Sequence, residues 1–291
     1  MRKSKANIFI HIPVIIFAIL CILPLIVILT ISVSDEAYIV ANGYSIFPKD
    51  ISFSAYKYIF ANPGDILSAY RITIMVTVIG LVTSLLICSG LGYVLSRKDF
   101  AWSRQLTFFV FFTMLFNGGM VPTYMVVTKL LKISDTILAM IIPLLVSAWN
   151  VMLLKSFFKG LPDSLIEAAR IDGASEIGIF FKIAIPLAKP ALATVGTFIA
   201  LGYWNDWYQS LLYINKKELV NLQFMLYKMM SNIQEMLDQM ENLPSGVDVN
   251  SIPNESARMA MCILAAGPMM FVFPFFQKYF VKGMTVGAVK G

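Results

Sequence analysis

Six long apolar stretches, almost free of charged residues, dominate this chain. A helix rises about 1.5 Å per residue and needs about 20 apolar residues to cross the hydrocarbon core of a bilayer. Because lipid offers no hydrogen-bond partners, backbone groups there must be satisfied within helices. No Asp, Glu, Lys or Arg lies between Lys5 and Asp35, Arg71 and Arg97, Arg104 and Lys129, Asp135 and Lys155, or Arg258 and Lys278, and Asp206 is the only one between Pro190 and Asn215. We therefore predict an all-α membrane protein with six transmembrane helices, over about residues 8–33, 70–95, 105–127, 136–155, 187–214 and 257–279.

The composition excludes several other classes of protein. Hydrophobic residues make up 58% of the chain and charged residues 14%, whereas soluble domains are closer to half apolar and a quarter charged. A soluble enzyme is therefore not expected, and the alternating pattern of a transmembrane β-barrel is missing. The net charge of +6 comes from scattered residues, so we predict membrane lipid and no nucleic acid as a partner. Cys21, Cys88 and Cys262 each lie in an apolar stretch, which predicts no disulfide framework and no metal site.

The charged residues between the apolar stretches predict the orientation. The N-terminus, residues 96–104, residues 155–189 and the C-terminal tail together hold 14 basic and 5 acidic residues, against 9 and 12 on the other side. Lys and Arg resist translocation, so the basic set should face the cytoplasm. We expect a multi-pass protein of the bacterial cytoplasmic membrane with both termini in the cytoplasm.

Residues 161–176 form the most informative segment between the stretches. Pro162 suits the first turn of a helix, and Asp163 places negative charge at the positive end of the helix dipole. Gly173 can adopt the left-handed conformation that ends a helix. The apolar side consists of Leu165, Ala168, Ala169 and Ile171, and the polar residues are Glu167, Arg170 and Asp172. We predict a short amphipathic helix outside the membrane, which either lies on the lipid headgroups or docks into a partner protein.

This segment resembles the EAA loop of ABC importer permeases. The residues that carry the resemblance are Glu167-Ala168-Ala169, Asp172-Gly173-Ala174, Phe180, Ile183, Ile185-Pro186 and Pro190. The resemblance implies the six-helix core of a type I importer, with a single permease domain over residues 1–291 and a cytoplasmic coupling loop over residues 156–186. It also implies a set of residues that contact the ATPase: Glu167, Ala168, Ala169, Asp172, Gly173 and Ala174.

Other stretches resemble the carbohydrate-uptake branch of these permeases, of the maltose-importer type. Trp204-Asn205-Asp206-Trp207 resembles its Trp-Asn-acid stretch, and residues 283–291 resemble its C-terminus. Residues 117–124 and 253–260 are similar to the subgroup associated with complex oligosaccharides. The resemblance therefore implies the permease subunit of an ATP-driven importer for carbohydrates, and favours oligosaccharides.

The resemblance also implies partners. A second permease completes the pathway, and we expect the two to form a heterodimer. Cytoplasmic ATP-binding subunits supply the energy, and an extracytoplasmic solute-binding protein delivers the substrate. This chain has no glycine-rich phosphate-binding loop. We therefore predict that it is not an enzyme and has no catalytic residue, metal or cofactor of its own, with ATP and Mg on the partner ATPase.

The fifth stretch contains the candidates for the substrate pathway. Asp206 is its only acid, and acids within membrane spans are functional candidates. Amide and carboxylate groups can bind sugar hydroxyls, while aromatic rings pack against the C–H faces of sugars. Trp204, Asn205, Asp206 and Tyr208 supply both kinds of group. The alternative is an aromatic belt at the membrane interface with a polar end.

Two other functions stay open on these residues. The EAA loop is shared by ABC permeases for other solutes, such as amino acids or metal ions. A secondary transporter driven by an ion gradient is the alternative from a different class, although such proteins usually carry several acids or broken helices around ion sites. Residues 222–240 add an amphipathic, Met-rich helix on the outer side, which either contacts the delivering protein or packs on the membrane domain.

Overall fold

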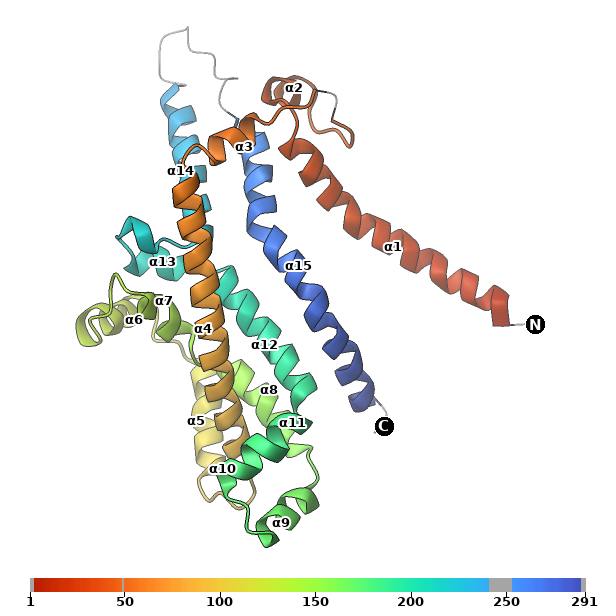
Figure 1. The fold of residues 1–291 in the computed structure, drawn as a ribbon, viewed down its shortest axis with the longest axis vertical. Helices are drawn as coiled ribbons and strands as arrows, with labels where there is room; N and C mark the ends of the chain where they lie inside the picture. The colour runs from red at the N-terminus through yellow and green to blue at the C-terminus, as the bar shows by residue number, and fades with distance from the viewer. Residues whose placement is uncertain (1–2, 49, 241–252, 289–291) are drawn as a thin grey trace. The chain divides into compact units, whose positions relative to one another are not determined.

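The computed structural model describes residues 3–48, 50–240 and 253–288. The regular elements in these ranges are helices, and one isolated β-bridge pairs Ser34 with Ile51. Figure 1 shows their order along the chain. The α-helices are α1 (Lys3–Ser32), α2 (Glu36–Asn42), α3 (Ser54–Ile59), α4 (Pro63–Ser96), α5 (Ser103–Leu115), α6 (Met120–Met125), α7 (Ile137–Ile141), α8 (Ala148–Lys159), α9 (Asp163–Ile171), α10 (Glu176–Ile179), α11 (Ile185–Leu187), α12 (Lys189–Trp204), α13 (Tyr208–Tyr213), α14 (Leu222–Met240) and α15 (Glu255–Ala288). The all-α prediction is confirmed. The last three residues of the predicted tail lie outside the described residues.

Three of the helices are long and apolar enough to cross a membrane, over His11–Ser32, Pro63–Ser96 and Glu255–Val272. Three bent helix pairs pass the same test together, which brings the described chain to as many as six spans if each pair is one span. The bends measure 112° between α5 and the segment Met120–Leu130, 52° between Ile137–Leu144 and α8, and 84° between Glu176–Leu187 and α12. The predicted span over residues 187–214 is divided, because α12 ends at Trp204 and α13 begins at Tyr208.

The bend after α5 has a local cause. The side-chain oxygen of Asn117 accepts a hydrogen bond from the Gly119 N–H at 2.9 Å. Gly119 has a φ of 87°, a left-handed conformation that residues with a Cβ rarely adopt. The helix therefore stops at Leu115 and restarts at Met120 in a new direction.

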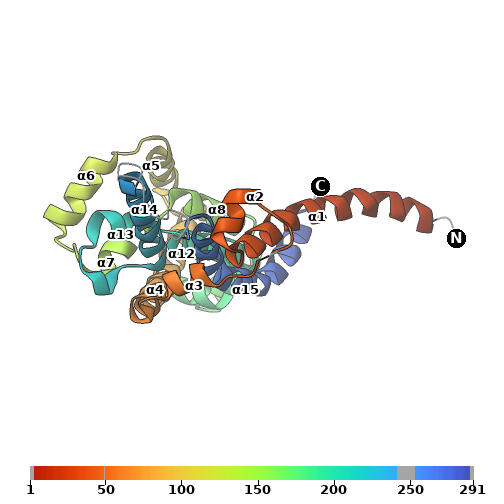
Figure 2. The same ribbon diagram turned by 90° about the horizontal axis from the view of Figure 1, so that it is seen from above.

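The chain forms two compact units, which we describe separately: residues 1–66 with 226–268, and residues 67–225 with 269–291. In the first unit, α1 extends from α2 and α3 as a single helix (Figure 2). Most of its side chains from His11 to Leu29 are exposed, as expected of a helix whose surroundings are lipid or another subunit. The prediction of one domain over residues 1–291 is not tested by this division and stays a prediction.

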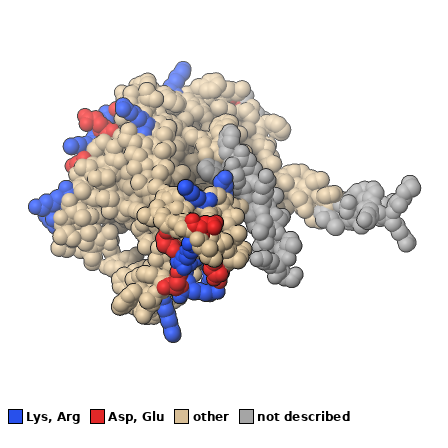
Figure 3. All heavy atoms as spheres, turned by 60° about the horizontal axis from the view of Figure 1, so that its bottom comes forward, with Lys and Arg blue, Asp and Glu red and all other residues tan. Residues whose placement is uncertain are grey.

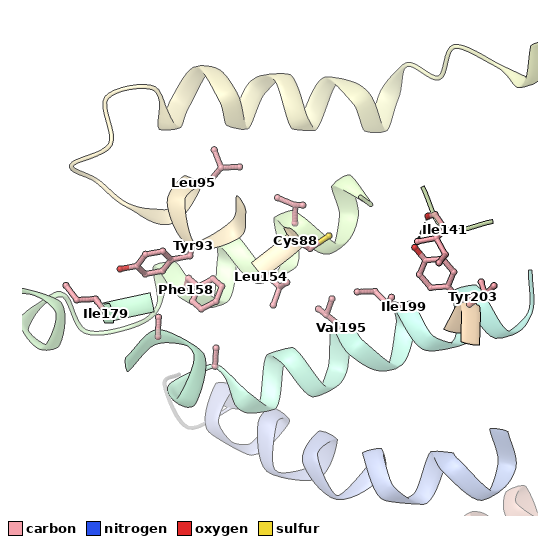
Figure 4. Packing of buried hydrophobic residues seen from close by; sticks show 14 of the residues in the cluster. Cys88, Tyr93, Leu95, Ile141, Leu154, Phe158, Ile179, Val195, Ile199 and Tyr203 are labelled. Atoms are coloured by element: carbon pink, nitrogen blue, oxygen red, sulfur yellow. Dashed lines mark hydrogen bonds between the residues drawn. The ribbon is translucent and has the colours of Figure 1, made fainter. Parts of the chain in front are cut away.

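The second unit contains the main apolar core, in which α8 packs against α5 and α12. Figure 4 shows buried side chains from α4, α8 and α12 meeting in this core. Tyr93 of α4 packs edge-on against Phe158 of α8, with ring centroids 5.7 Å apart. Cys88 lies fully buried in the core, and all three cysteines are unpaired.

A buried hydrogen-bonded contact joins three elements of this core. The Leu145 N–H bonds to the Ile142 carbonyl at 3.2 Å, so the Ile141 carbonyl is released from the regular helical pattern. The Tyr203 hydroxyl of α12 donates to that carbonyl at 3.0 Å, and lies 3.0 Å from the Ser84 hydroxyl of α4. Broken helices are tolerated in membranes where neighbouring side chains satisfy the freed backbone groups. The contact therefore stabilises the bend between α7 and α8.

In the first unit, Glu36 binds the start of α15. Its side chain is buried, and the carboxylate accepts hydrogen bonds from the Glu255 N–H at 2.8 Å, the Ser256 N–H at 3.0 Å and the Ser256 hydroxyl at 2.6 Å. The first N–H groups of a helix have no partner within the helix, and its N-terminus favours negative charge. Glu36 therefore caps α15 from a position more than 200 residues away in the chain.

We predict that Glu36→Gln lowers the stability of the protein. Gln has one carbonyl oxygen, so its amide N–H₂ group would face backbone donors that the carboxylate now accepts. Hydrogen bonds to a charged group contribute about 1.5–3 kcal/mol, and a loss of that size should lower the unfolding midpoint in detergent. Asp50→Asn, at an exposed position in the same unit, is the control. An unchanged midpoint for Glu36→Gln would contradict the prediction.

Candidate functional site

Helix α9 contains most of the residues that the sequence predicts for coupling. It begins after Pro162 and ends at Ile171, and Gly173 has a φ of 79°. The Ala174 N–H bonds to the Ala169 carbonyl at 2.9 Å, and the Gly173 N–H bonds to the Arg170 carbonyl at 3.0 Å. These are the two hydrogen bonds of a Schellman motif, in which glycine is preferred at the left-handed position. Asp172, Gly173 and Ala174 therefore form the turn that ends α9.

The two faces of α9 differ from the predicted arrangement. Ile166 and Ala169 are the buried residues of this helix. Leu165 is 45% exposed and Ile171 is 86% exposed, although the sequence analysis grouped both with Ala169 on one apolar side. Ala169 and Ile171 are two positions apart, which puts them about 200° apart around the helix axis, so they cannot share one face. Ile166, and not Leu165, is the residue that packs inward with Ala169. The helix thus presents apolar side chains both inward and outward.

The other predicted coupling residues lie on the exposed surface. Glu167 and Ala168 are both exposed, and Glu167 forms no ion pair with any residue that the structure describes. Ile177, just beyond the turn, is also exposed, at 72%. The surface of the α9–α10 segment therefore combines exposed apolar side chains with a carboxylate that has no ion-pair partner among the described residues.

A group of ion pairs joins α9 to the loop between α4 and α5. The Arg170 guanidinium donates to the Asp99 carboxylate and, through Nε at 2.7 Å, to Glu176. Arg97 donates to the same Asp99 carboxylate at 3.1 and 3.2 Å. Figure 3 shows basic and acidic side chains intermingled at the end of the molecule that carries α9. The charge distribution along the chain predicts that both segments lie on one side of the membrane, but it does not indicate that they pair.

A cavity of about 570 Å³ lies beside this network. Its apolar walls come from the end of α4 and from the segment that follows α10, and the charged side chains of the network line it as well. The lining residues are Gly90, Tyr93, Val94, Arg97, Asp99, Phe100, Arg170, Glu176, Ile177, Phe180 and Phe181. Close packing is therefore incomplete on this side of the α9–α10 segment.

The Asp99 carboxylate should stay ionised far into the acid range. The Arg170 guanidinium lowers the pKa of Asp99 to about 2, with Arg97 acting in the same direction. A carboxyl group whose pKa is lower in the folded state stabilises the fold above its unfolded pKa of about 3.9. We predict that the stability difference between the wild type and Asp99→Asn is constant from pH 5 to 8 and shrinks as the pH falls from about 4 to 2. Denaturant titrations at several pH values test this, and a difference that disappears by pH 6 would contradict it.

The structure does not bring all four predicted pathway residues to one surface. Trp204, the last residue of α12, is 4% exposed. Asn205 is exposed in the break before α13, and Tyr208 is 37% exposed at the start of that helix. Trp207 packs edge-on against Tyr208, with ring centroids 6.0 Å apart. The accessible aromatic group near Asn205 is therefore the Trp207–Tyr208 pair, whereas Trp204 belongs to the interior.

Asp206 supports the break between α12 and α13. Its carboxylate accepts a hydrogen bond from the Gln209 N–H at 3.3 Å, and its backbone carbonyl accepts one from the Asn221 side chain. Side-chain oxygens that precede a helix commonly satisfy its first N–H groups. The second carboxylate oxygen is buried and has no hydrogen-bond partner in the described structure. Asp206 thus holds the start of α13 through one carboxylate oxygen, while the other is buried without a hydrogen-bond partner in the described structure.

Comparison with known proteins decides the family. Residues 6–286 match the sequence model of the binding-protein-dependent transport system inner membrane component. The chain belongs to this family. It is therefore a multi-pass permease subunit of the inner or cytoplasmic membrane, a transport component and not an enzyme, and the ATPase is a separate protein. The match excludes the predicted alternative of a secondary transporter that works alone.

Several relatives resemble the permease over nearly its whole length. The polygalacturonan/rhamnogalacturonan transport system permease protein YtcP of Bacillus subtilis (strain 168) is 37% identical over 100% of both chains. The arabinooligosaccharides transport system permease protein AraQ of the same organism is 32% identical over 89% of this chain and 86% of its own. A chain from the crystal structure of a bacterial ABC transporter involved in the import of the acidic polysaccharide alginate has a TM-score of 0.78 and 32% identity, over 96% of this chain and 98% of that one.

Proposed function

We propose that this permease forms one half of the membrane pathway of an ABC importer for oligosaccharides. Relatives named for polygalacturonan, arabinooligosaccharides and alginate all support a carbohydrate substrate built of several sugar units. A second, different permease completes the pathway, and an extracytoplasmic solute-binding protein delivers the sugar. Both termini lie in the cytoplasm, as the excess of Lys and Arg on that side indicates.

We further propose that α9 is the contact with the ATP-binding subunits, which hold ATP and Mg. The observation that carries this proposal is the outward face of α9, where Leu165, Ala168 and Ile171 are exposed around a carboxylate, Glu167, without an ion-pair partner in the described chain. Exposed apolar side chains next to a charge are typical of a surface that a partner covers. A lipid-lying helix would satisfy the apolar side chains but would leave no role for Glu167.

The substrate pathway is proposed to include Asn205, Trp207 and Tyr208. The Asn205 amide can form hydrogen bonds with sugar hydroxyls, and the rings of Trp207 and Tyr208 can pack against the C–H groups of the sugar. Asp206 supports this surface by holding the turn before α13. Trp204, buried at the end of α12, would contribute by shaping the turn rather than by touching the sugar.

Co-purification and uptake together test the proposed function. This permease, its partner permease and the ATPase should co-purify. Ile171→Arg, which places a charge on the outward face of α9, should release the ATPase. Proteoliposomes supplied with the binding protein should take up labelled oligosaccharides from a panel of oligogalacturonates, alginate oligomers and arabino-oligosaccharides. ATPase that still binds Ile171→Arg, or uptake of none of these sugars, would refute the corresponding part of the proposal.

We predict that Asn205→Ala lowers oligosaccharide uptake about 10-fold, while stimulation of ATP hydrolysis by the binding protein is retained. The size corresponds to the loss of one hydrogen bond worth about 1.4 kcal/mol. Gln223→Ala, which changes an amide at the start of α14 instead, is a control with wild-type uptake. Equal uptake by Asn205→Ala and the wild type would remove Asn205 from the pathway.

A further inference from the structure

Helix α9 is attached to the rest of the permease by a small apolar contact and an ionic contact. Ile166 and Ala169 are the residues of α9 that enter the core, and one of these is only an alanine. The ionic contact runs from Arg170 to Asp99, in the loop between α4 and α5. Because a cavity lies beside the network, the charged contact is not backed by close packing there.

The ionic contact also connects separate helices. Asp99 lies three residues beyond the end of α4 and four residues before the start of α5. Its carboxylate forms ion pairs with Arg97 of the same loop and with Arg170 of α9. Arg170 also forms an ion pair with Glu176 at the start of α10. A displacement of α9 is therefore opposed by charges in the α4–α5 loop and on α10.

We infer that Asp99 is a positioning residue for transport: through Arg170 it makes the α4–α5 loop move with α9. This inference rests on the proposed docking of α9 to the ATPase. In that cycle, a movement imposed on α9 by the ATPase reaches α4 and α5 through the Asp99–Arg170 contact. Without the contact, α9 would move while α4 and α5 lag behind, and ATP would be hydrolysed with less transport.

A neighbouring ion pair provides a matched control. Lys98 Nζ lies 2.7 Å from the Asp163 carboxylate and also joins the loop to α9, but the two side chains are 78% and 56% exposed. The Arg170 and Asp99 side chains are 39% and 43% exposed. Water and salt screen an ion pair more strongly the more exposed it is, so the Lys98–Asp163 pair should contribute less than the Asp99–Arg170 pair. Asp99 also accepts from two guanidinium groups at once, which fixes its geometry.

The experiment measures movement and coupling in the assembled complex. Spin labels are attached at Ser164→Cys on α9 and Trp102→Cys in the loop, both at exposed positions, after the exposed native Cys21 and Cys262 have been replaced by Ser. In the otherwise wild-type complex, the distance between the labels should stay narrow and equal in the nucleotide-free and the vanadate-trapped states. Asp99→Asn should broaden the distribution of this distance. It should also lower the amount of oligogalacturonate transported per ATP hydrolysed by about 10-fold, the ratio that corresponds to a typical coupling energy within one ionic network. Lys98→Gln should change neither.

A double-mutant cycle completes the test. Asp99→Asn and Arg170→Gln should each reduce transport per ATP. The double variant should lose no more than the more severe single variant, because both substitutions remove the Asp99–Arg170 contact. The inference is overturned if Asp99→Asn keeps the narrow distance and the wild-type ratio, if Lys98→Gln has the same effect, or if the two losses multiply. Failure of the docking proposal is recognised separately, since Ile171→Arg would then leave the ATPase bound.

Discussion

Replacing Glu167 with Ala is expected to reduce oligosaccharide uptake at least about 100-fold, while the permease still reaches the membrane. The expectation rests on the proposed contact of α9 with the ATPase. Glu167 is exposed and has no ion-pair partner within the described chain, so a basic residue of the ATPase would be its first partner. Breaking one desolvated ion pair costs about 3–5 kcal/mol, and each 1.4 kcal/mol corresponds to a factor of about ten.

Uptake and binding-protein-stimulated ATP hydrolysis in proteoliposomes measure this effect. Ser164→Ala, at another exposed position of α9, should behave like the wild type, which separates the loss of the carboxylate from a change in the helix. Membrane content of each variant is checked by immunoblotting. Normal uptake by Glu167→Ala would show that the carboxylate has no part in coupling.

The largest effect on stability is expected for Gly80→Ala. An added Cβ at Gly80 would lie 2.5 Å from two atoms of the Tyr203 ring, far inside van der Waals contact. The ring cannot move away easily, because the Tyr203 hydroxyl is bound to the Ile141 carbonyl and to Ser84. Overpacking of a core costs about 1–3 kcal/mol, and a buried carbonyl that loses its donor costs about 1–3 kcal/mol more. Thermal unfolding in detergent should show a clear decrease.

Two companion variants identify the cause of that decrease. Gly90→Ala lies in the same helix, α4, and its added Cβ meets no atom within 4 Å. It should be neutral or stabilising by up to about 1 kcal/mol, because Ala is the better helix former. Tyr203→Phe removes only the hydroxyl and should reproduce the hydrogen-bond part of the loss. If Gly80→Ala unfolded at the wild-type temperature, the close contact with Tyr203 would not be rigid.

Gly173 and the predicted pathway residues show which features can be predicted from the sequence and which cannot. The left-handed turn at Gly173 was predictable because it depends on glycine and on backbone groups three to five residues away. The break after α5 also has a local cause, at Asn117 and Gly119, although residues 105–127 were predicted as one span. In contrast, Trp204 and Tyr208 are four residues apart, yet one is buried and the other exposed. The helix ends between them, and only packing reveals on which side each ring lies.

The amino-acid sequence alone was enough to indicate a helical membrane protein, its family and the short helix that carries Glu167. These features depend on local composition, on the length of apolar stretches and on motifs a few residues long. Only the tertiary structure revealed that Arg170 binds Asp99 and that Tyr203 binds Ile141, partners 71 and 62 residues apart. The physical reason is that such contacts depend on how separate helices pack together, and no spacing along the chain records which side chains meet.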